Sequence, residues 1–204
     1  MNAFGRFRQQ ARAAADRRRI AGDSGPRRIR SGIGTAGFDR AVNAWVLPLP
    51  VLDPQVVEAS ARALDRYGPD FSYRHFAAVE NPLVAGAMVA GVAGMAALAQ
   101  LPPARQAMLR LRPPGAGPSP ERRDRSWFRA RFVADCGDRR VATEVSGGDP
   151  GYGETSKMLA ESAMCLAGDP LPQTAGQVTT AVAMGDALRD RLEKAGIGFR
   201  VLRS

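Results

Sequence analysis

The residues best suited to bind a charged group lie in a glycine-rich segment, Gly147 to Lys157. Glycines and a proline fix a tight turn there, and the turn leads into a predicted helix whose first backbone N–H groups attract anions. A phosphate, a carboxylate or a carbonyl oxygen of a substrate could bind at this point. The predicted substrate-binding residues are Gly148, Asp149, Tyr152 and Lys157. The alternative is structural, with Asp149 and Thr155 capping the helix.

A second candidate is the pair Tyr73 and His75, which lie two residues apart in the segment Phe71–Val79. The partial alternation of this segment predicts one strand, and residues two apart on a strand share a face. A tyrosine or a histidine can donate a proton beside a carbon that accepts a hydride. Tyr73 and His75 are therefore the predicted catalytic residues, with Asp70 and Asp149 as polar partners. The alternative is a structural role for the single histidine.

The sequence contains few cysteine and histidine side chains that could bind a metal. Cys136, Cys165 and His75 are the only cysteines and the only histidine, so neither a four-cysteine zinc site nor a two-cysteine, two-histidine site can be built. Residues 1–12 alternate apolar and basic side chains and contain no continuous apolar core of a secretory signal. We therefore expect a cytoplasmic protein with two free thiols.

The segment Gly32–Gly37 has the spacing G-x-G-x-x-G of a dinucleotide-binding fingerprint. That fingerprint works only between an apolar strand and a helix, whose N-terminus meets the pyrophosphate. Here the flanking residues 26–30 are mostly basic, and residues 38–50 run into two prolines. We predict a loop at this position, and no cofactor bound by this chain alone.

The net charge of +9 is concentrated at one end of the chain. Residues 1–30 carry nine arginines and two aspartates, and the rest is close to neutral. We predict a basic N-terminal arm over residues 1–30, with a short helix at Phe4–Ile20, and a main domain over residues 31–204. Because the charge lies in the arm, we do not expect nucleic acid as a partner of the main domain.

The main domain shows the patterns of an α+β fold, a small mixed sheet with a hairpin, packed by helices. Trp45–Pro50 is an extended strip whose prolines argue against a central strand. Asp53 is placed to cap a helix that begins with Pro54. The other expected elements are a hairpin of Trp127–Ala134 and Arg139–Ser146, helices over 154–167 and 181–195, and a closing strand over 197–202. The inner face expected for the first of these helices is Met158, Leu159, Ser162, Ala163, Cys165 and Leu166.

An unbroken apolar run, Leu83 to Ala99, sits at the lower length limit for a membrane span. Arginines follow it, as a headgroup contact would require, and its glycines and alanines have the small-xxx-small spacing of close helix contacts. We favour a buried or interface helix, with membrane contact through residues 83–99 as the alternative. A proline-rich loop is predicted at 112–120.

Several motifs in combination closely resemble the C-terminal half of the saccharopine-dehydrogenase-like family, which includes bacterial trans-acting enoyl reductases. They extend over most of the chain, from Trp45 to Leu188. The motifs are Trp45–Pro50 with Asp53–Val57, Arg66–Phe71 with Tyr73 and His75, Gly147–Tyr152 with Glu154, Thr155 and Lys157–Ala163, and Gly176–Thr180 with Met184–Leu188.

This resemblance implies a two-part oxidoreductase of bacterial lipid metabolism. In such an enzyme an N-terminal Rossmann domain binds NADP or NAD, and a C-terminal α+β domain closes over a lipid-like enoyl or imine substrate. The present chain departs from the pattern because it lacks the N-terminal cofactor fingerprint. We expect a truncated gene, a misassigned start, or a missing domain supplied in trans, and a chain that is inactive by itself. A homodimer and a non-catalytic, membrane-associated or interaction module are the alternatives.

Overall fold

The computed structural model describes residues 27–49, 51–111 and 117–203. The helix predicted at Phe4–Ile20, Pro50 and the first part of the predicted loop 112–120 lie outside the described residues. The described chain forms two compact units. The first contains residues 27–33 and 51–75, and the second contains residues 34–49 and 76 onward.

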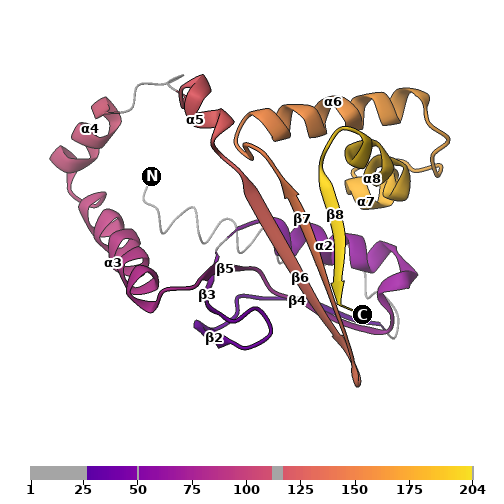
Figure 1. The fold of residues 1–204 in the computed structure, drawn as a ribbon, viewed down its shortest axis with the longest axis horizontal. Coiled ribbons are helices and arrows are strands. Elements are labelled where there is room, and N and C mark those ends of the chain that lie inside the picture. Colours follow the sequence, from indigo (N-terminus) through magenta and orange to yellow (C-terminus); the bar gives the residue numbers. More distant parts are fainter. Residues whose placement is uncertain (1–26, 50, 112–116, 204) are drawn as a thin grey trace. The chain divides into compact units, whose positions relative to one another are not determined.

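The first unit is built around a pair of parallel strands. Strand β1 (Arg28–Ser31) pairs with β4 (Asp70–Tyr73), and helix α2 (Asp53–Ala63) packs on both. A short 3₁₀ helix, η1 (Asp65–Tyr67), connects α2 to β4. Figure 1 labels α2 and β4 of this β–α–β arrangement. Parallel strands need such a crossover, because a tight hairpin can join only antiparallel strands.

Residues 27–30, which the sequence assigned to the basic arm, belong to this folded unit. Ile29 is buried under α2. The Arg27 guanidinium donates hydrogen bonds to the carbonyl oxygens of Ala61 (3.0 Å), Leu64 (3.1 Å) and Gly68 (3.0 Å). A cation at the C-terminal end of a helix satisfies carbonyl groups that have no partner within the helix. This arginine therefore has a structural role.

Helix α2 begins as expected, but its cap differs from the prediction. Its N-cap residue is Leu52, which makes no side-chain capping hydrogen bond, and Asp53 is the acidic residue of the first turn. A carboxylate in that position still interacts favourably with the positive end of the helix dipole. The prediction that Asp53 caps the helix is therefore wrong, although the helix and its N-terminal proline are confirmed.

The second unit contains two antiparallel sheets, and the first has the strand order β2-β3-β5. Its strands are β2 (Gly37–Asp39), β3 (Ala44–Pro48) and β5 (Phe76–Val79). The prediction that prolines keep residues 45–50 out of a central strand is wrong, because β3 is the middle strand. Pro48 is tolerated because it pairs only with Phe76 on β5, whereas β2 pairs with residues 44–46.

The single strand predicted over Phe71–Val79 is two strands. The chain breaks at Arg74 and His75, so that β4 joins the parallel pair and β5 joins the sheet with β3. Each half pairs along its whole length with a different neighbour, which fixes the break. Periodicity alone could not reveal this, because both halves are extended and the break depends on which strands they pair with.

Helix α3 (Pro82–Leu98) follows β5 and leads into α4 (Pro102–Leu111). The Asn81 side chain accepts a hydrogen bond from the Leu83 N–H (2.8 Å) and so caps α3. The helix was expected to be buried or at an interface, but Ala85 is its only buried residue in the structure. None of the helices in the described part of the chain is both long enough and apolar enough to cross a membrane.

The second sheet of this unit has the order β6-β7-β8 and is antiparallel throughout. Strands β6 (Phe128–Cys136) and β7 (Arg139–Gly147) form the predicted hairpin, and β8 (Gly198–Arg203) pairs with the second of them. Gly137 has φ of 62° at the first turn position, the conformation that a type II′ turn requires. Helix α5 (Pro120–Asp124) lies just before the hairpin in sequence.

Three helices gather beside this sheet and hold the core of the unit (Figure 1). They are α6 (Gly153–Gly168), α7 (Thr180–Ala183) and α8 (Gly185–Lys194). Cys165, Met184 and Leu188 form the buried cluster, with Leu171, Ala183, Ala187 and Leu192 packed against it. The helix predicted over 181–195 is interrupted at Gly185, whose φ of 49° departs from helical geometry.

The inner face predicted for α6 is only partly correct. Cys165 is buried and Met158 is half-buried, but Leu159 and Leu166 are exposed. The face toward α8 carries Glu161 instead, because Arg191 on α8 binds both Glu161 (3.3 Å) and Asp169 (2.6 and 2.8 Å). The two Arg191 hydrogen bonds lower the pKa of Asp169 to about 2.

The architecture is therefore α+β, with small sheets packed by helices, as the sequence predicts. Both cysteines are free thiols: Cys136 is exposed and Cys165 is buried. Burial is the main cause that raises the pKa of the Cys165 thiol, and the neighbouring Asp169 carboxylate adds to the effect. A thiol held in its neutral form is a weak nucleophile, so Cys165 is a core residue and not a reactive one.

Candidate functional site

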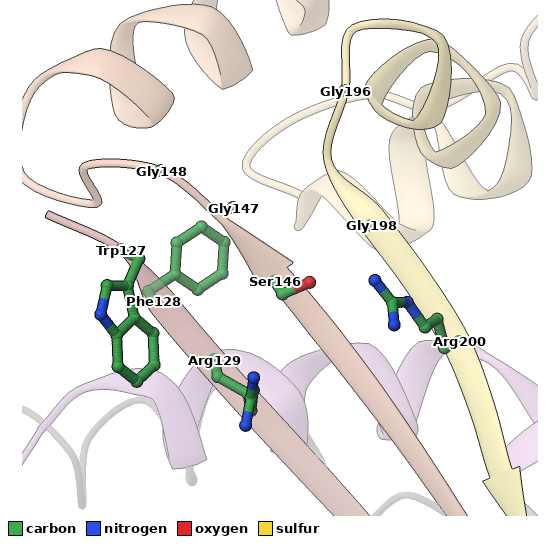
Figure 2. Close-up of a pocket in the computed structure, with 9 residues that line it drawn as sticks. All are labelled: Trp127, Phe128, Arg129, Ser146, Gly147, Gly148, Gly196, Gly198 and Arg200. Carbon is green, nitrogen blue, oxygen red and sulfur yellow. The ribbon is translucent and has the colours of Figure 1, made fainter. Parts of the chain in front are cut away.

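A cleft of about 410 Å³ opens at the end of the β6-β7-β8 sheet where β7 leads into α6. Figure 2 shows its lining, which comes from the starts of β6 and β8 and the end of β7. Volumes of this order are typical of small-molecule sites. The lining residues are Trp127, Phe128, Arg129, Ser146, Gly147, Gly148, Gly196, Gly198 and Arg200.

Two arginines give the cleft its positive charge. Arg129 lies on β6 and Arg200 on β8, on either side of β7 (Figure 2). Beside them Glu144 on β7 is buried, and it binds Arg131 (3.0 Å) and Arg129 (3.4 Å). The hydrogen bond from Arg131, with the charges of Arg129 and Arg200, lowers the pKa of Glu144. One carboxylate thus faces three guanidinium groups, which leaves positive charge for a ligand anion.

The aromatic side of the cleft is Trp127, a residue that is 69 % exposed. The Arg129 guanidinium carbon lies 5.6 Å from the centre of the indole ring, which is the geometry of a cation–π contact. This contact orients both side chains at the mouth of the cleft. An exposed aromatic ring beside two cations suits a ligand that has an anionic group and an apolar or planar body.

Close approach of side chains to glycine shapes the floor of the cleft. A Cβ atom at Gly147 would lie 2.6 Å from the Phe128 ring, and one at Gly198 would lie 2.9 Å from the Ser146 hydroxyl. Both pairs are direct partners in the strand register, Phe128 with Gly147 and Ser146 with Gly198. The glycines therefore make room for side chains of the neighbouring strand.

We expect Gly147→Ala to destabilise the second unit by about 1–3 kcal/mol, because the new methyl group overlaps the Phe128 ring. Urea unfolding followed by circular dichroism measures this difference. Gly151→Ala in the same turn is the control, because its Cβ would lie at an ordinary contact distance of 3.6 Å from Asp149. Combining Gly147→Ala with Phe128→Leu should recover part of the loss. Equal stability of Gly147→Ala and the wild type would contradict the close packing.

The turn between β7 and α6 is held by Asp149. Its carboxylate accepts hydrogen bonds from the backbone N–H groups of Tyr152 (2.8 Å), Gly153 (3.0 Å) and Gly151 (3.4 Å). These bonds, the one from Gly153 first, lower the pKa of Asp149. Asp149 thus already occupies the anion-attracting start of α6, and Thr155 donates to the Pro150 carbonyl oxygen (2.5 Å). Asp149 therefore has the structural role that the alternative gave it, whereas Thr155 lies within the first turn of α6 and bonds to Pro150 without capping the helix.

The other predicted substrate-binding residues have varied surroundings. Gly148 lines the cleft. The Lys157 ammonium binds the Glu154 carboxylate at 2.8 and 3.0 Å, and Glu154 also accepts a hydrogen bond from the Gly148 N–H (3.3 Å). Tyr152 is about half exposed, and its hydroxyl lies against Gly117. Of these four residues, Gly148 and Lys157 are thus connected to the cleft, Lys157 indirectly through Glu154.

The predicted catalytic pair lies in the first unit, at the carboxyl end of the parallel strands. The Tyr73 hydroxyl is 3.3 Å from His75 Nδ1, so the two side chains meet although His75 follows β4 and is not part of it. Burial, followed by the charge of Asp53, raises the pKa of Tyr73. The Gly32 N–H donates to the Tyr73 carbonyl oxygen (3.2 Å) and ties the two strand ends together. In α/β sheets, ligands bind at the carboxyl ends of the strands.

Two further polar side chains of the parallel pair of strands have partners other than Tyr73 and His75. Ser31 donates a short hydrogen bond to the Glu58 carboxylate. Asp70, predicted as a partner of the catalytic pair, lies 3.6 Å from Arg30 at the opposite end of β4. Tyr73 and His75 therefore contact each other, the charge of Asp53 acts on Tyr73, and Asp70 pairs with Arg30 instead.

The glycine segment Gly32–Gly37 does not have the geometry of a dinucleotide site. It follows strand β1, but it leads into strand β2 and not into a helix. A pyrophosphate at this position would lack the helix N-terminus that stabilises it. These residues do not fit NAD or NADP. Within residues 27–49, 51–111 and 117–203, no group of three or more histidine, cysteine, aspartate or glutamate side chains is arranged to hold a metal ion.

Comparison with curated proteins connects this chain to one kind of enzyme. A provisionally named trans-acting enoyl reductase of Mycobacterium tuberculosis is 34 % identical over 187 residues, which cover 85 % of this chain and 42 % of that protein. The trans-acting enoyl reductase of Mycobacterium ulcerans is 36 % identical over 145 residues, which cover 64 % of this chain and 34 % of that protein. This chain is similar in sequence to proteins named trans-acting enoyl reductase. It spans about two fifths of the length of the first of these relatives.

No protein-family model matches the chain, and no solved structure is significantly similar to it. The fold described above therefore rests on this chain's own structure. The homology extends over both compact units, because a match over 85 % of the chain cannot be contained in either unit alone.

The cleft includes side chains that the sequence did not single out, namely Trp127, Arg129, Ser146 and Arg200. A signal was present in the run Trp127-Phe128-Arg129-Ala130-Arg131, where arginines alternate along a strand behind an aromatic residue. Alternating arginines mark one face of a strand. Their partner Glu144 and the contribution of Arg200 depend on strand pairing, which sequence spacing does not reveal.

Proposed function

We propose that this chain supplies the substrate-side part of an NAD(P)-dependent enoyl reductase of the saccharopine-dehydrogenase-like type. The observation that carries the proposal is the 34 % identity over 85 % of the chain to a protein named as a trans-acting enoyl reductase. The expected substrate is a lipid-like enoyl compound. The nicotinamide cofactor would be held by a domain outside this chain, because the glycine segment Gly32–Gly37 lacks the required helix.

The parallel pair of strands supports this proposal. Parallel strands occur almost entirely in larger sheets whose two faces are both covered. Among the described residues, β1 and β4 pair only with each other, and α2 is the one long helix packed on them. Such a pair is suited to continue a larger parallel sheet of a cofactor-binding domain. Tyr73 and His75 would then lie at the edge where that sheet binds its ligands.

The cleft on the other unit supports a role in holding the substrate. Arg129 and Arg200 present positive charge beside the exposed ring of Trp127. We assign the binding of an anionic ligand group, a carboxylate or a phosphate, to these two arginines. Guanidinium groups bind such anions with charge-assisted hydrogen bonds. An apolar chain could rest against Trp127.

A chimera tests this function. This chain replaces the matching 187-residue stretch of the Mycobacterium tuberculosis relative, and NADPH oxidation is measured with a 2-enoyl thioester that carries a phosphate. We expect enoyl-dependent NADPH oxidation by the chimera. The unfused chain should show no NADPH binding when titrated and followed by nicotinamide fluorescence. A folded chimera that binds NADPH but does not reduce enoyl compounds would contradict the proposal, as would micromolar NADPH binding by the unfused chain.

In the same chimera, Arg129→Gln and Arg200→Gln should each raise KM about 10- to 100-fold, because each removes one charged hydrogen bond to the substrate anion. Arg140→Gln is the matched control. Arg140 lies at the far end of the same hairpin, where it pairs with the exposed Asp135 (2.5 Å). An enoyl thioester without the phosphate should respond little to the first two variants. Equal KM values for all three variants would remove the cleft from the function.

A further inference from the structure

Helix α3 presents apolar side chains to the surface around its whole circumference. Sixteen of its 17 residues are not buried, and Ala85 is the exception. At about 100° per residue, Leu83, Met88 and Val89 point in directions separated by roughly 140°, 100° and 120°. The exposed fractions of these three residues are 81, 43 and 54 %. No single face of α3 is therefore the apolar one.

This distribution of apolar side chains indicates which environment surrounds α3. A protein partner that packs on one side of a helix selects an apolar stripe and leaves polar residues on the opposite face. Residues 82–98 contain no charged residue and no polar side chain at all. A helix that is apolar on all sides is typical of the core of a large protein or of a membrane. A helix that is apolar all round and exposed would otherwise be an aggregation hazard.

The length of α3 and the residues that follow it restrict how far the helix can reach into an apolar phase. At about 1.5 Å per residue, 17 residues reach roughly 26 Å, less than the hydrocarbon core of about 30 Å. Residues 82–112 include three arginines, Arg105, Arg110 and Arg112, and no acidic residue. Basic residues directly after an apolar helix are placed to meet anionic headgroups. Pro102 starts a separate helix, α4, so the chain bends between the apolar and the basic part.

We propose that α3 is a membrane-contact element that enters one leaflet of an anionic lipid bilayer, with the arginines that follow it in the sequence supplying positive charge for the lipid headgroups. This proposal is independent of the enzymatic one, because it uses no residue of the cleft or of the Tyr73–His75 pair. Asn81 and Pro82 fix the start of α3 beside β3 and β5, so the element projects from a folded sheet. It would bring the second unit to a lipid surface without crossing it.

Site-specific fluorescence distinguishes lipid from protein as the covering phase. In the full chain, Cys136→Ser removes the exposed thiol, while Cys165 is fully buried and stays unlabelled. Leu83→Cys, Met88→Cys and Val89→Cys, one at a time, then carry a polarity-sensitive dye. We expect a blue shift at all three positions when phosphatidylcholine vesicles containing phosphatidylglycerol are added. Shifts at only one or two positions, or shifts that occur without vesicles as protein concentration rises, would indicate a second copy of the chain and overturn the proposal.

Vesicle flotation with two further variants tests the division of roles. Val84→Glu with Val92→Glu places charges at exposed positions of α3 and should abolish flotation with neutral and anionic vesicles alike. Replacing Arg105, Arg110 and Arg112 by glutamine should reduce the preference for anionic vesicles by about fivefold for each arginine. Unchanged unfolding midpoints show that these variants are folded. If the valine variant floats as well as the wild type, another segment binds the lipid and the proposal fails.

Discussion

Replacing Leu188 by alanine is expected to lower the free energy of unfolding of the second unit by about 2–5 kcal/mol. Leu188 is buried in the cluster with Cys165 and Met184, where α6, α7 and α8 meet. Removing its side chain loses the transfer free energy of the buried methyl groups and leaves a cavity that these short helices can only partly close. The unit has one small buried cluster in its described part, so this loss is a large share of its stability.

Chemical unfolding followed by circular dichroism measures the effect of Leu188→Ala, and two variants on α6 serve as controls. Leu159→Ala and Leu166→Ala remove the same atoms from side chains that are exposed in the structure. Each should change the stability by no more than about 0.5 kcal/mol. The sequence assigned both of these leucines to the inner face of α6, so the comparison also tests the structure against that prediction. Equal losses for Leu159 and Leu188 would favour the sequence prediction.

The elements that the sequence predicts correctly are those with strong local signals. The hairpin of β6 and β7 follows from alternation on both sides of a Gly137-Asp138 turn. Helix α2 follows from Pro54 and helical spacing, and the end of α8 follows from Gly196, which has φ of 94°. These features depend on a few neighbouring residues, so no knowledge of distant contacts is needed to find them.

The errors occur where distant parts of the chain decide the structure. Phe71–Val79 divides into two strands because its halves pair with β1 and β3, which lie more than 25 residues earlier. Pro48 sits in a middle strand because β2 is too short to reach it. Leu159 is exposed, whereas Glu161 two residues later faces α8 and pairs with Arg191. Tertiary contacts override local patterns in each of these cases.

The candidate site shows the same division. The sequence pointed to the turn at Gly148 and Asp149, and Gly148 does line the cleft. The arginines of the cleft were missed because they lie on two strands about 70 residues apart, and only the pairing of both β6 and β8 with β7 brings them to one end of the sheet. The burial of the Glu144 carboxylate could not be predicted from the sequence either, because it depends on the guanidinium groups that pair with it across the sheet.

Replacing Tyr73 by phenylalanine in the enoyl reductase chimera is expected to lower kcat by about 10²- to 10⁴-fold, the usual contribution of a positioned proton donor. Reduction of an enoyl group adds a hydride to one alkene carbon and a proton to the other. In the proposed step the Tyr73 O–H bond breaks as the new C–H bond forms, and water restores the proton through His75, whose Nδ1 is 3.3 Å from the hydroxyl. Burial raises the pKa of Tyr73 above its ordinary value near 10, so the hydroxyl stays protonated throughout the neutral range.

Three comparisons separate this role from a structural one. Tyr67→Phe removes a hydroxyl from the same unit and should leave kcat unchanged. The Tyr67 ring packs edge-on against Phe71, with 4.9 Å between the ring centroids. His75→Gln should lower kcat less than Tyr73→Phe, because the direct donor remains. We expect the wild-type rate to decline at alkaline pH, above the ordinary pKa of tyrosine near 10, and the Tyr73→Phe rate to lack this decline, since no phenol is left to ionise. A variant that keeps the wild-type kcat, or that loses activity only together with thermal stability, would show that Tyr73 supports the fold and does not donate the proton.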